Sequence, residues 1–129
     1  MPVRWAIAEQ RRPKERAAPR VYVSLNRRGE IAMNAEAFYQ IDEPANVTLM
    51  YDRKRRQIGV KFPVSKDGNF FRVRRYGRGG RMRIVRAARM LKQFGIEVEN
   101  TLVFRDAATA VYRGSPMLLL PLDKAERVA

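Results

Sequence analysis

Apolar and polar residues alternate in several short segments from residue 21 onward, and alternation with a period of two predicts half-buried β-strands. In Val21–Leu25, for example, the two valines and the leucine share one face of such a strand. On this pattern we predict strands over 21–25, 30–33, 47–51, 58–62, 71–76, 81–84, 101–104 and 117–120.

Two segments between these strands have helical spacing. Asn34 can cap a helix over 35–41, and Pro44 prevents its continuation. A second helix is predicted over 85–94, because Gly95 supplies a C-terminal stop. The connections are predicted to be turns at 26–29 and 77–80, a charged hairpin at 52–57 and a longer loop at 105–116.

The predicted order of elements occurs twice, as two halves that each read strand-strand-helix-strand-strand. Superposing Gly29 on Gly80 and matching Ile41 with Ile96 requires about four extra residues, close to one turn, in the second helix. The expected organisation is a basic flexible arm (1–20), a first ββαββ half (21–64), a linker (65–70), a second ββαββ half (71–122) and a frayed tail (123–129).

The segment Asn26–Ala35, with its Arg-Gly turn, is followed by a short helix ending at Ile41 and by strands that begin at Val47 and Ile58. This arrangement resembles the swapped-hairpin DNA-binding domains of the AbrB, SpoVT, MazE and MraZ families. The resemblance covers residues 20–122. It implies a mostly β fold with two short helices, in which two ββαββ halves interlock into a pseudo-twofold small β-barrel. A double-psi barrel is a neighbouring possibility.

In those families two units interlock, so one chain that carries both is expected to be a pseudo-dimeric monomer or a homodimer. The resemblance also implies that the strand-turn-strand region meets DNA. Asn26, Arg27 and Arg28 are therefore candidates by position.

The formal net charge is +14 in 129 residues, and arginine supplies most of the 27 basic side chains. Such a charge creates a positive field that attracts polyanions. The planar guanidinium makes bidentate contacts with phosphates and with guanine edges, whereas a merely solubilising surface would use lysine freely. The composition therefore favours nucleic acid as the partner.

Cysteine and histidine are both absent, which excludes disulfides, thiolate zinc sites, cysteine nucleophiles and the usual acid-base group at neutral pH. The carboxylate clusters Asp42–Glu43 and Glu97–Glu99 lie beside predicted helix ends or loops, where exposed acids are normal. We therefore expect a protein that is not an enzyme and that holds no metal and no cofactor. No run of 18 or more apolar residues occurs, so no membrane span is expected either.

The densest basic stretch runs from Arg72 to Lys92 and contains no acidic residue. Strand alternation predicts that Arg72 and Arg74 share one face with Arg81 and Arg83 of the neighbouring strand, above an apolar underside. Like charges at this density repel one another unless a polyanion is present. We therefore interpret the stretch as a binding face.

Three further groups of basic residues complete the candidate interface. Arg86 and Arg89 are expected side by side on the second helix, and Arg78 lies in a glycine-rich turn that can approach phosphate closely. The cluster Arg53–Arg56 either binds or keeps a hairpin tip soluble. The candidate nucleic-acid-binding residues are Arg27, Arg28, Arg72, Arg74, Arg75, Arg78, Arg81, Arg83, Arg86 and Arg89.

The sequence thus predicts a cytoplasmic, nucleoid-associated protein that binds nucleic acid, with duplex DNA favoured over RNA, as a transcriptional regulator or architectural factor. Alternatives are a ribosome-associated RNA-binding factor, an antitoxin-like module with an acidic protein partner and, least favoured, an enzyme acting on a nucleotide. Tyr22 and Tyr76 either stack on bases of a single strand or pack on the sheet surface.

Overall fold

The computed structural model describes residues 20–62, 70–105 and 107–128. The predicted arm (1–20), apart from Arg20, and the predicted linker (65–70), apart from Phe70, lie outside the described residues. The α-helices are α1 (Ala35–Gln40) and α2 (Ala88–Gln93), and two short 3₁₀ turns are η2 (Arg78–Gly80) and η3 (Leu122–Lys124). The strands are β1 (Tyr22–Leu25), β2 (Glu30–Met33), β3 (Asn46–Asp52), β4 (Gln57–Lys61), β5 (Phe71–Tyr76), β6 (Met82–Arg86), β7 (Thr101–Arg105), β8 (Thr109–Tyr112), β9 (Ser115–Pro121) and β10 (Glu126–Val128).

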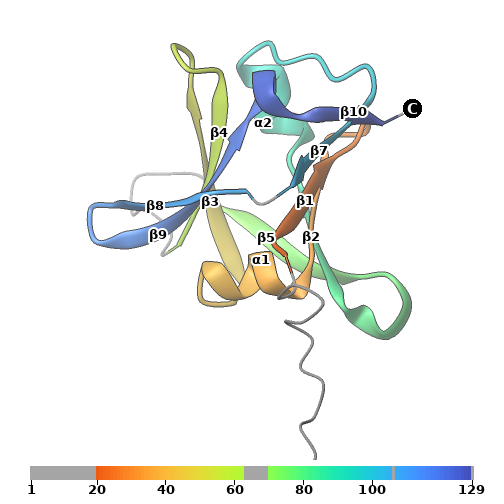
Figure 1. The fold of residues 1–129 in the computed structure, drawn as a ribbon, viewed down its shortest axis with the longest axis vertical. Coiled ribbons are helices and arrows are strands. Elements are labelled where there is room, and N and C mark those ends of the chain that lie inside the picture. Colours follow the sequence, from red (N-terminus) through yellow and green to blue (C-terminus); the bar gives the residue numbers. More distant parts are fainter. Residues whose placement is uncertain (1–19, 63–69, 106, 129) are drawn as a thin grey trace, which may run out of the picture.

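These strands form one 10-stranded antiparallel sheet in the order β10-β7-β1-β2-β6-β5-β3-β4-β9-β8 (Figure 1). Hairpin β1–β2 lies between β7 and β6 of the second half, and hairpin β5–β6 lies between β2 and β3 of the first half. Within the described residues β10 and β8 are free edges, so the sheet is not closed. The prediction of a mostly β chain with two short helices is confirmed.

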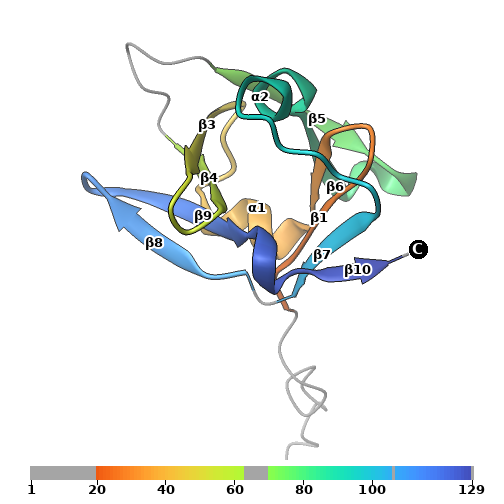
Figure 2. The same cartoon turned by 90° about the horizontal axis from the view of Figure 1, so that it is seen from above.

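The inward face of the sheet surrounds one apolar core. Seen from above, the strands run around this core, and α1 and α2 lie at its opposite ends (Figures 1 and 2). Burying each large aliphatic side chain contributes on the order of 1.5–3 kcal/mol, so the core supplies most of the driving force for folding. Its largest fully buried side chains are Leu25, Ile31, Met33, Ile41, Ile58, Leu118, Leu120, Val23, Val47, Val60 and Val85.

The two helices begin in different ways. Asn34 caps α1 as predicted, because its Oδ1 accepts the backbone N–H of Ala37 at 2.9 Å. Helix α2 has no side-chain cap. Instead, the N–H of Ala87, the residue just before α2, donates to the backbone oxygen of Gly29 at 2.7 Å. The turn of the first hairpin therefore supplies a hydrogen-bond acceptor for the backbone N–H at the start of the second helix.

The structure corrects three element predictions. The second helix begins at Ala88, because residues 85 and 86 continue β6, where Val85 faces the core opposite Ile31. The predicted loop 105–116 contains β8, which the sequence pattern did not indicate because this edge strand buries no side chain. The predicted frayed tail contains β10, which pairs with β7.

The predicted equivalence of the two halves is also corrected, because the extra length of the second half lies in its hairpin. Both helices have six residues. The core-facing pair nearest the first turn is Leu25 with Ile31, which encloses residues 26–30. The matching core-facing pair of the second hairpin is Val73 with Val85, which encloses the longer segment 74–84. The second hairpin therefore extends beyond the core.

Gly29 lies where the first hairpin meets α2. Its φ is +82°, and a Cβ added there would lie 2.8 Å from the backbone Cα of Ala88. Only glycine combines a left-handed conformation with such a close approach of two backbones. The turn is further ordered by Asn26, whose Oδ1 accepts the backbone N–H groups of Arg28 and Glu30, each at 3.0 Å.

Gly29→Ala is expected to lower the free energy of unfolding by roughly 2–4 kcal/mol, because it adds a backbone clash to the left-handed strain. Gly114→Ala is the matched control, since Gly114 also has a φ of +81° but its added Cβ would meet nothing within 4 Å. The control substitution should lower the free energy of unfolding by only about 1–2 kcal/mol. Urea unfolding of both variants checks this, and equal losses would show that the contact with Ala88 is not required.

Candidate nucleic-acid interface

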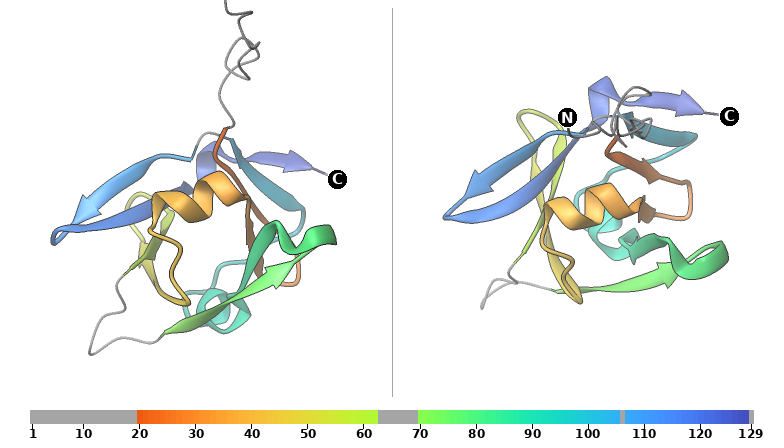
Figure 3. Two further views of the ribbon diagram at one scale, coloured as in Figure 1. Left: turned by 90° about the horizontal axis from the view of Figure 1, so that it is seen from below. Right: turned by 60° about the horizontal axis from the view of Figure 1, so that its bottom comes forward.

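Hairpin β5–β6 projects from the body of the protein. In both views of Figure 3 this green hairpin extends past the neighbouring strands. Its tip is built by Gly77, Gly79 and Gly80, all with positive φ, and the N–H of Gly80 donates to the oxygen of Gly77 at 3.1 Å. The exposed side chains of Arg78 and Arg81 lie at this tip.

The predicted single basic face of this hairpin is wrong. Directly opposite residues share a face, and the register pairs Arg75 with Arg83 but Arg74 with Ile84. Arg75 and Arg83 therefore lie on the face that continues the core side of Val73, while Arg74 lies on the outer face. The physical reason is a register one residue away from the predicted one, which moves a side chain to the other face. Arginines consequently surround the hairpin on both faces.

Arg83 braces the hairpin tip against α1. Its Nη1 donates to the backbone oxygens of Gly80 at 2.6 Å and of Met82 at 3.2 Å. Its guanidinium carbon lies 5.0 Å from the centroid of the Phe38 ring. Arg83 is therefore a positioning residue in this structure, in contrast to its predicted role as a direct contact.

The other hairpin arginines have no ion pair and no aromatic partner among residues 20–62, 70–105 and 107–128. All of them are exposed. Without a neutralising partner they raise the local positive potential, and they remain available to an anion from outside. The set comprises Arg72, Arg74, Arg75, Arg78 and Arg81; Arg86, at the end of β6, is also exposed but lies opposite Glu30.

The basic cluster at the tip of hairpin β3–β4 differs, because most of its cations already have partners. Arg53 lies 5.4 Å from the centroid of the Phe94 ring. Arg55 pairs with Asp52 at 3.5 Å and Arg56 pairs with Asp123 at 3.3 Å. These contacts favour a structural role for this cluster.

The candidates outside the long hairpin lie apart from its tip. Arg27 and Arg28 occupy the β1–β2 turn, and the antiparallel pairing of β2 with β6 places that turn and the Arg78 turn at opposite ends of the pair (Figure 1). Arg86 ends β6 and Arg89 lies on α2, so their predicted adjacency on one helix is wrong. Arg89 lies 4.9 Å from the centroid of the Phe71 ring, at the start of β5.

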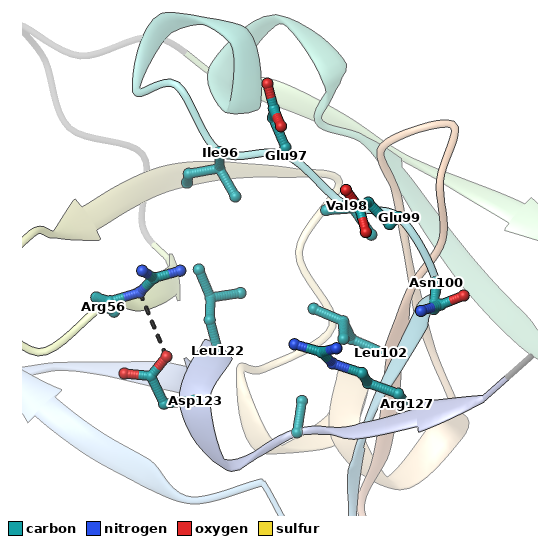
Figure 4. Close-up of a pocket in the computed structure, with 11 residues that line it drawn as sticks. Arg56, Ile96, Glu97, Val98, Glu99, Asn100, Leu102, Leu122, Asp123 and Arg127 are labelled. Carbon is teal, nitrogen blue, oxygen red and sulfur yellow. Dashed lines mark ion pairs between the residues drawn. The ribbon is translucent and has the colours of Figure 1, made fainter.

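A cavity of about 400 Å³ lies between the α2–β7 loop, the β3–β4 tip and the C-terminal segment (Figure 4). Glu97, Glu99 and Asp123 line it, together with Arg56 and Arg127. Among the described residues no group of three or more acidic side chains could hold a metal ion. The mixed charges of this cavity give no reason to place a polyanion there.

Sequence reasoning missed one basic residue on the outer face of the sheet. Arg105, at the end of β7, has its guanidinium 5.9 Å from the centroid of the Tyr22 ring and pairs with Glu126 at 2.5 Å. The sequence does not indicate that Tyr22 and Arg105 are neighbours, because they are far apart in the chain and no local spacing links them. Only the pairing of β1 with β7 brings them together.

Comparisons of the chain with protein-family models, curated proteins and solved structures found no match. Across the ranges that the structure describes, no helix is long and apolar enough to cross a membrane.

Arg83→Lys is expected to loosen the hairpin tip, because lysine keeps the charge but lacks the planar fork that spans Gly80, Met82 and the Phe38 ring. Hydrogen–deuterium exchange of the amides of 77–81 should become faster, with a loss of about 1 kcal/mol in stability. Arg81→Lys is the control and should leave these amides unchanged. Equal exchange in both variants would contradict the bracing role.

Proposed function

We propose that this protein binds nucleic acid through hairpin β5–β6, with duplex DNA as the favoured polymer, and that it acts as a transcriptional regulator or architectural factor. The observation that carries the proposal is the set of exposed hairpin arginines without a partner among the described residues. By contrast, arginines at the β3–β4 tip contact acidic or aromatic side chains.

Electrostatic repulsion within the hairpin supports an anionic partner. Arg75 lies directly opposite Arg83 in the β5–β6 register. Like charges facing each other across strands destabilise a hairpin, and no acidic residue lies between Arg72 and Lys92 to offset them. A phosphate backbone that approaches the hairpin would remove this repulsion.

The shape of the hairpin suits duplex DNA. The major groove is about 12 Å wide and admits a two-stranded β-ribbon. In such a complex Arg78 and Arg81, at the tip, would reach base edges, while Arg72, Arg74 and Arg75 along the strands would contact phosphates. The phosphate contacts would supply most of the affinity.

The interleaving of the two hairpins supports the finer fold proposal, a pseudo-twofold swapped-hairpin arrangement within one chain. Each hairpin pairs with strands of the other half. In this proposal the two halves have diverged, since the second hairpin is longer and carries the unneutralised arginines, whereas Gly29 in the first turn packs on α2.

Removing two strand arginines that would contact phosphates should lower both the affinity and its salt dependence. For the double variant Arg74→Ala/Arg75→Ala, fluorescence-anisotropy titrations of a labelled 16-base-pair duplex between 50 and 200 mM salt are the measurement. Each phosphate contact contributes a slope of about −0.9 to the plot of log K against log salt, so the slope should become shallower by about 2. Arg83 is left intact because it positions the tip.

Lys54→Ala/Arg55→Ala is the matched control, because it removes the same charge from the β3–β4 tip, which lies at the far side of the molecule (Figure 1). Its affinity should stay within about twofold of the unaltered protein. If both double variants weaken binding equally, net charge rather than the hairpin accounts for it. If the unaltered protein binds no polymer at 50 mM salt, the proposed function is wrong.

A further inference from the structure

In the part of the chain that the structure describes, no helix covers the outer face of the sheet, because α1 and α2 lie at the two ends of the core (Figures 1 and 2); two apolar side chains of this face are almost fully buried. Ile84 is 5% and Val103 is 2% exposed, and both lie on the face opposite the core. The strand registers place them in one cross-strand row, Glu126–Val103–Ser24–Ala32–Ile84–Arg74. The middle of this row consists of the short side chains of Ser24 and Ala32, which rise less above the sheet than the longer side chains at either end of the row.

Two tyrosines stand on this face in the neighbouring cross-strand row, each two residues along its strand from the row of Ser24 and Arg74. Tyr22 of β1 shares the face of Ser24, and Tyr76 of β5 shares the face of Arg74. The strand order β1-β2-β6-β5 puts three strand spacings, about 14 Å, between them. Tyr76 is 56% exposed, so most of its ring is accessible to a ligand.

The charges around the tyrosines are arranged to attract a polyanion. Arg72 and Arg74 lie on the same outer face and have no acidic partner among the described residues, while Arg86 on this face lies directly opposite Glu30 in the β2–β6 register. Of the two acids on this face, Glu126 is held by Arg105 at 2.5 Å. Glu30 accepts a hydrogen bond from the side chain of Asn26 at 2.8 Å. The cations on this face are therefore in excess.

We infer that this outer face binds single-stranded nucleic acid, with bases stacked on Tyr22 and Tyr76 and phosphates held by Arg72, Arg74 and Arg86. The inference rests on the proposed function for the affinity for polyanions, and it adds a second form of polymer, a single strand, bound at a face that the duplex does not use for stacking. A basic sheet face with an exposed Tyr76 and a half-buried Tyr22 suits unpaired bases, because every base offers a ring face for stacking. Duplex DNA cannot use the tyrosines in this way, since its bases are already stacked on one another.

The test compares three labelled probes at 50 mM salt: a 15-nucleotide poly-dT strand, the same strand with abasic sites in place of its central bases, and a 15-base-pair duplex. The abasic strand keeps every phosphate and removes only the stacking partners. We expect it to bind the unaltered protein at least tenfold more weakly than poly-dT. Tyr76→Leu and Tyr22→Leu should each weaken poly-dT binding by roughly tenfold and leave duplex binding within twofold.

Tyr39→Leu is the matched control, because Tyr39 is 69% exposed but lies on α1 near Glu36 and Glu43. It should bind poly-dT like the unaltered protein. Because Tyr76 is exposed, its variant keeps the test decisive even if Tyr22→Leu fails to fold.

Equal binding of poly-dT and its abasic form would overturn the inference and leave the proposed function intact, since phosphates alone would then account for binding. Binding of the duplex with no binding of poly-dT would have the same meaning. Failure of all three probes to bind would overturn both proposals.

Discussion

The antiparallel pairing of β2 with β6 is the contact on which the rest of the structure depends. It joins the hairpin of one half to the hairpin of the other at the middle of the sheet. On its inward face it sets Ile31 against Val85 in the core. The same pairing sends the two hairpin turns to opposite ends, so one turn packs on α2 while the other projects into solvent (Figure 1).

This division of roles explains how the two hairpins can share a topology and differ in chemistry. The first turn is fixed by Gly29 against Ala88 and by the side chain of Asn26, so its contribution is structural. The second hairpin continues past the core, and beyond Val73 and Val85 its core-side face carries Arg75 and Arg83 instead of apolar side chains. Arginines occupy that extension at a cost in repulsion, which an anionic partner would offset.

Much of the strand pattern could be predicted from the sequence, because alternation of apolar and polar residues indicates burial on one face. The helix cap at Asn34 could also be predicted, because asparagine is a favoured N-cap residue. The faces of the arginines could not be predicted, because a shift of one residue in register reverses them. The sequence places Val85 in a helix because the adjacent apolar residues Ile84 and Val85 break the alternation that indicates a strand. Both are in fact buried in the strand, each on a different face of the sheet. The neighbourhood of Tyr22 and Arg105 depends on a pairing between distant strands, which spacing alone does not encode.

The most direct test of the central claim is to follow the backbone amides by NMR while a 16-base-pair duplex is added to isotope-labelled protein. We expect the largest shift changes within 72–81, on the projecting hairpin. Changes centred on the β3–β4 tip at 53–56, or on the cavity of Figure 4, would contradict this expectation.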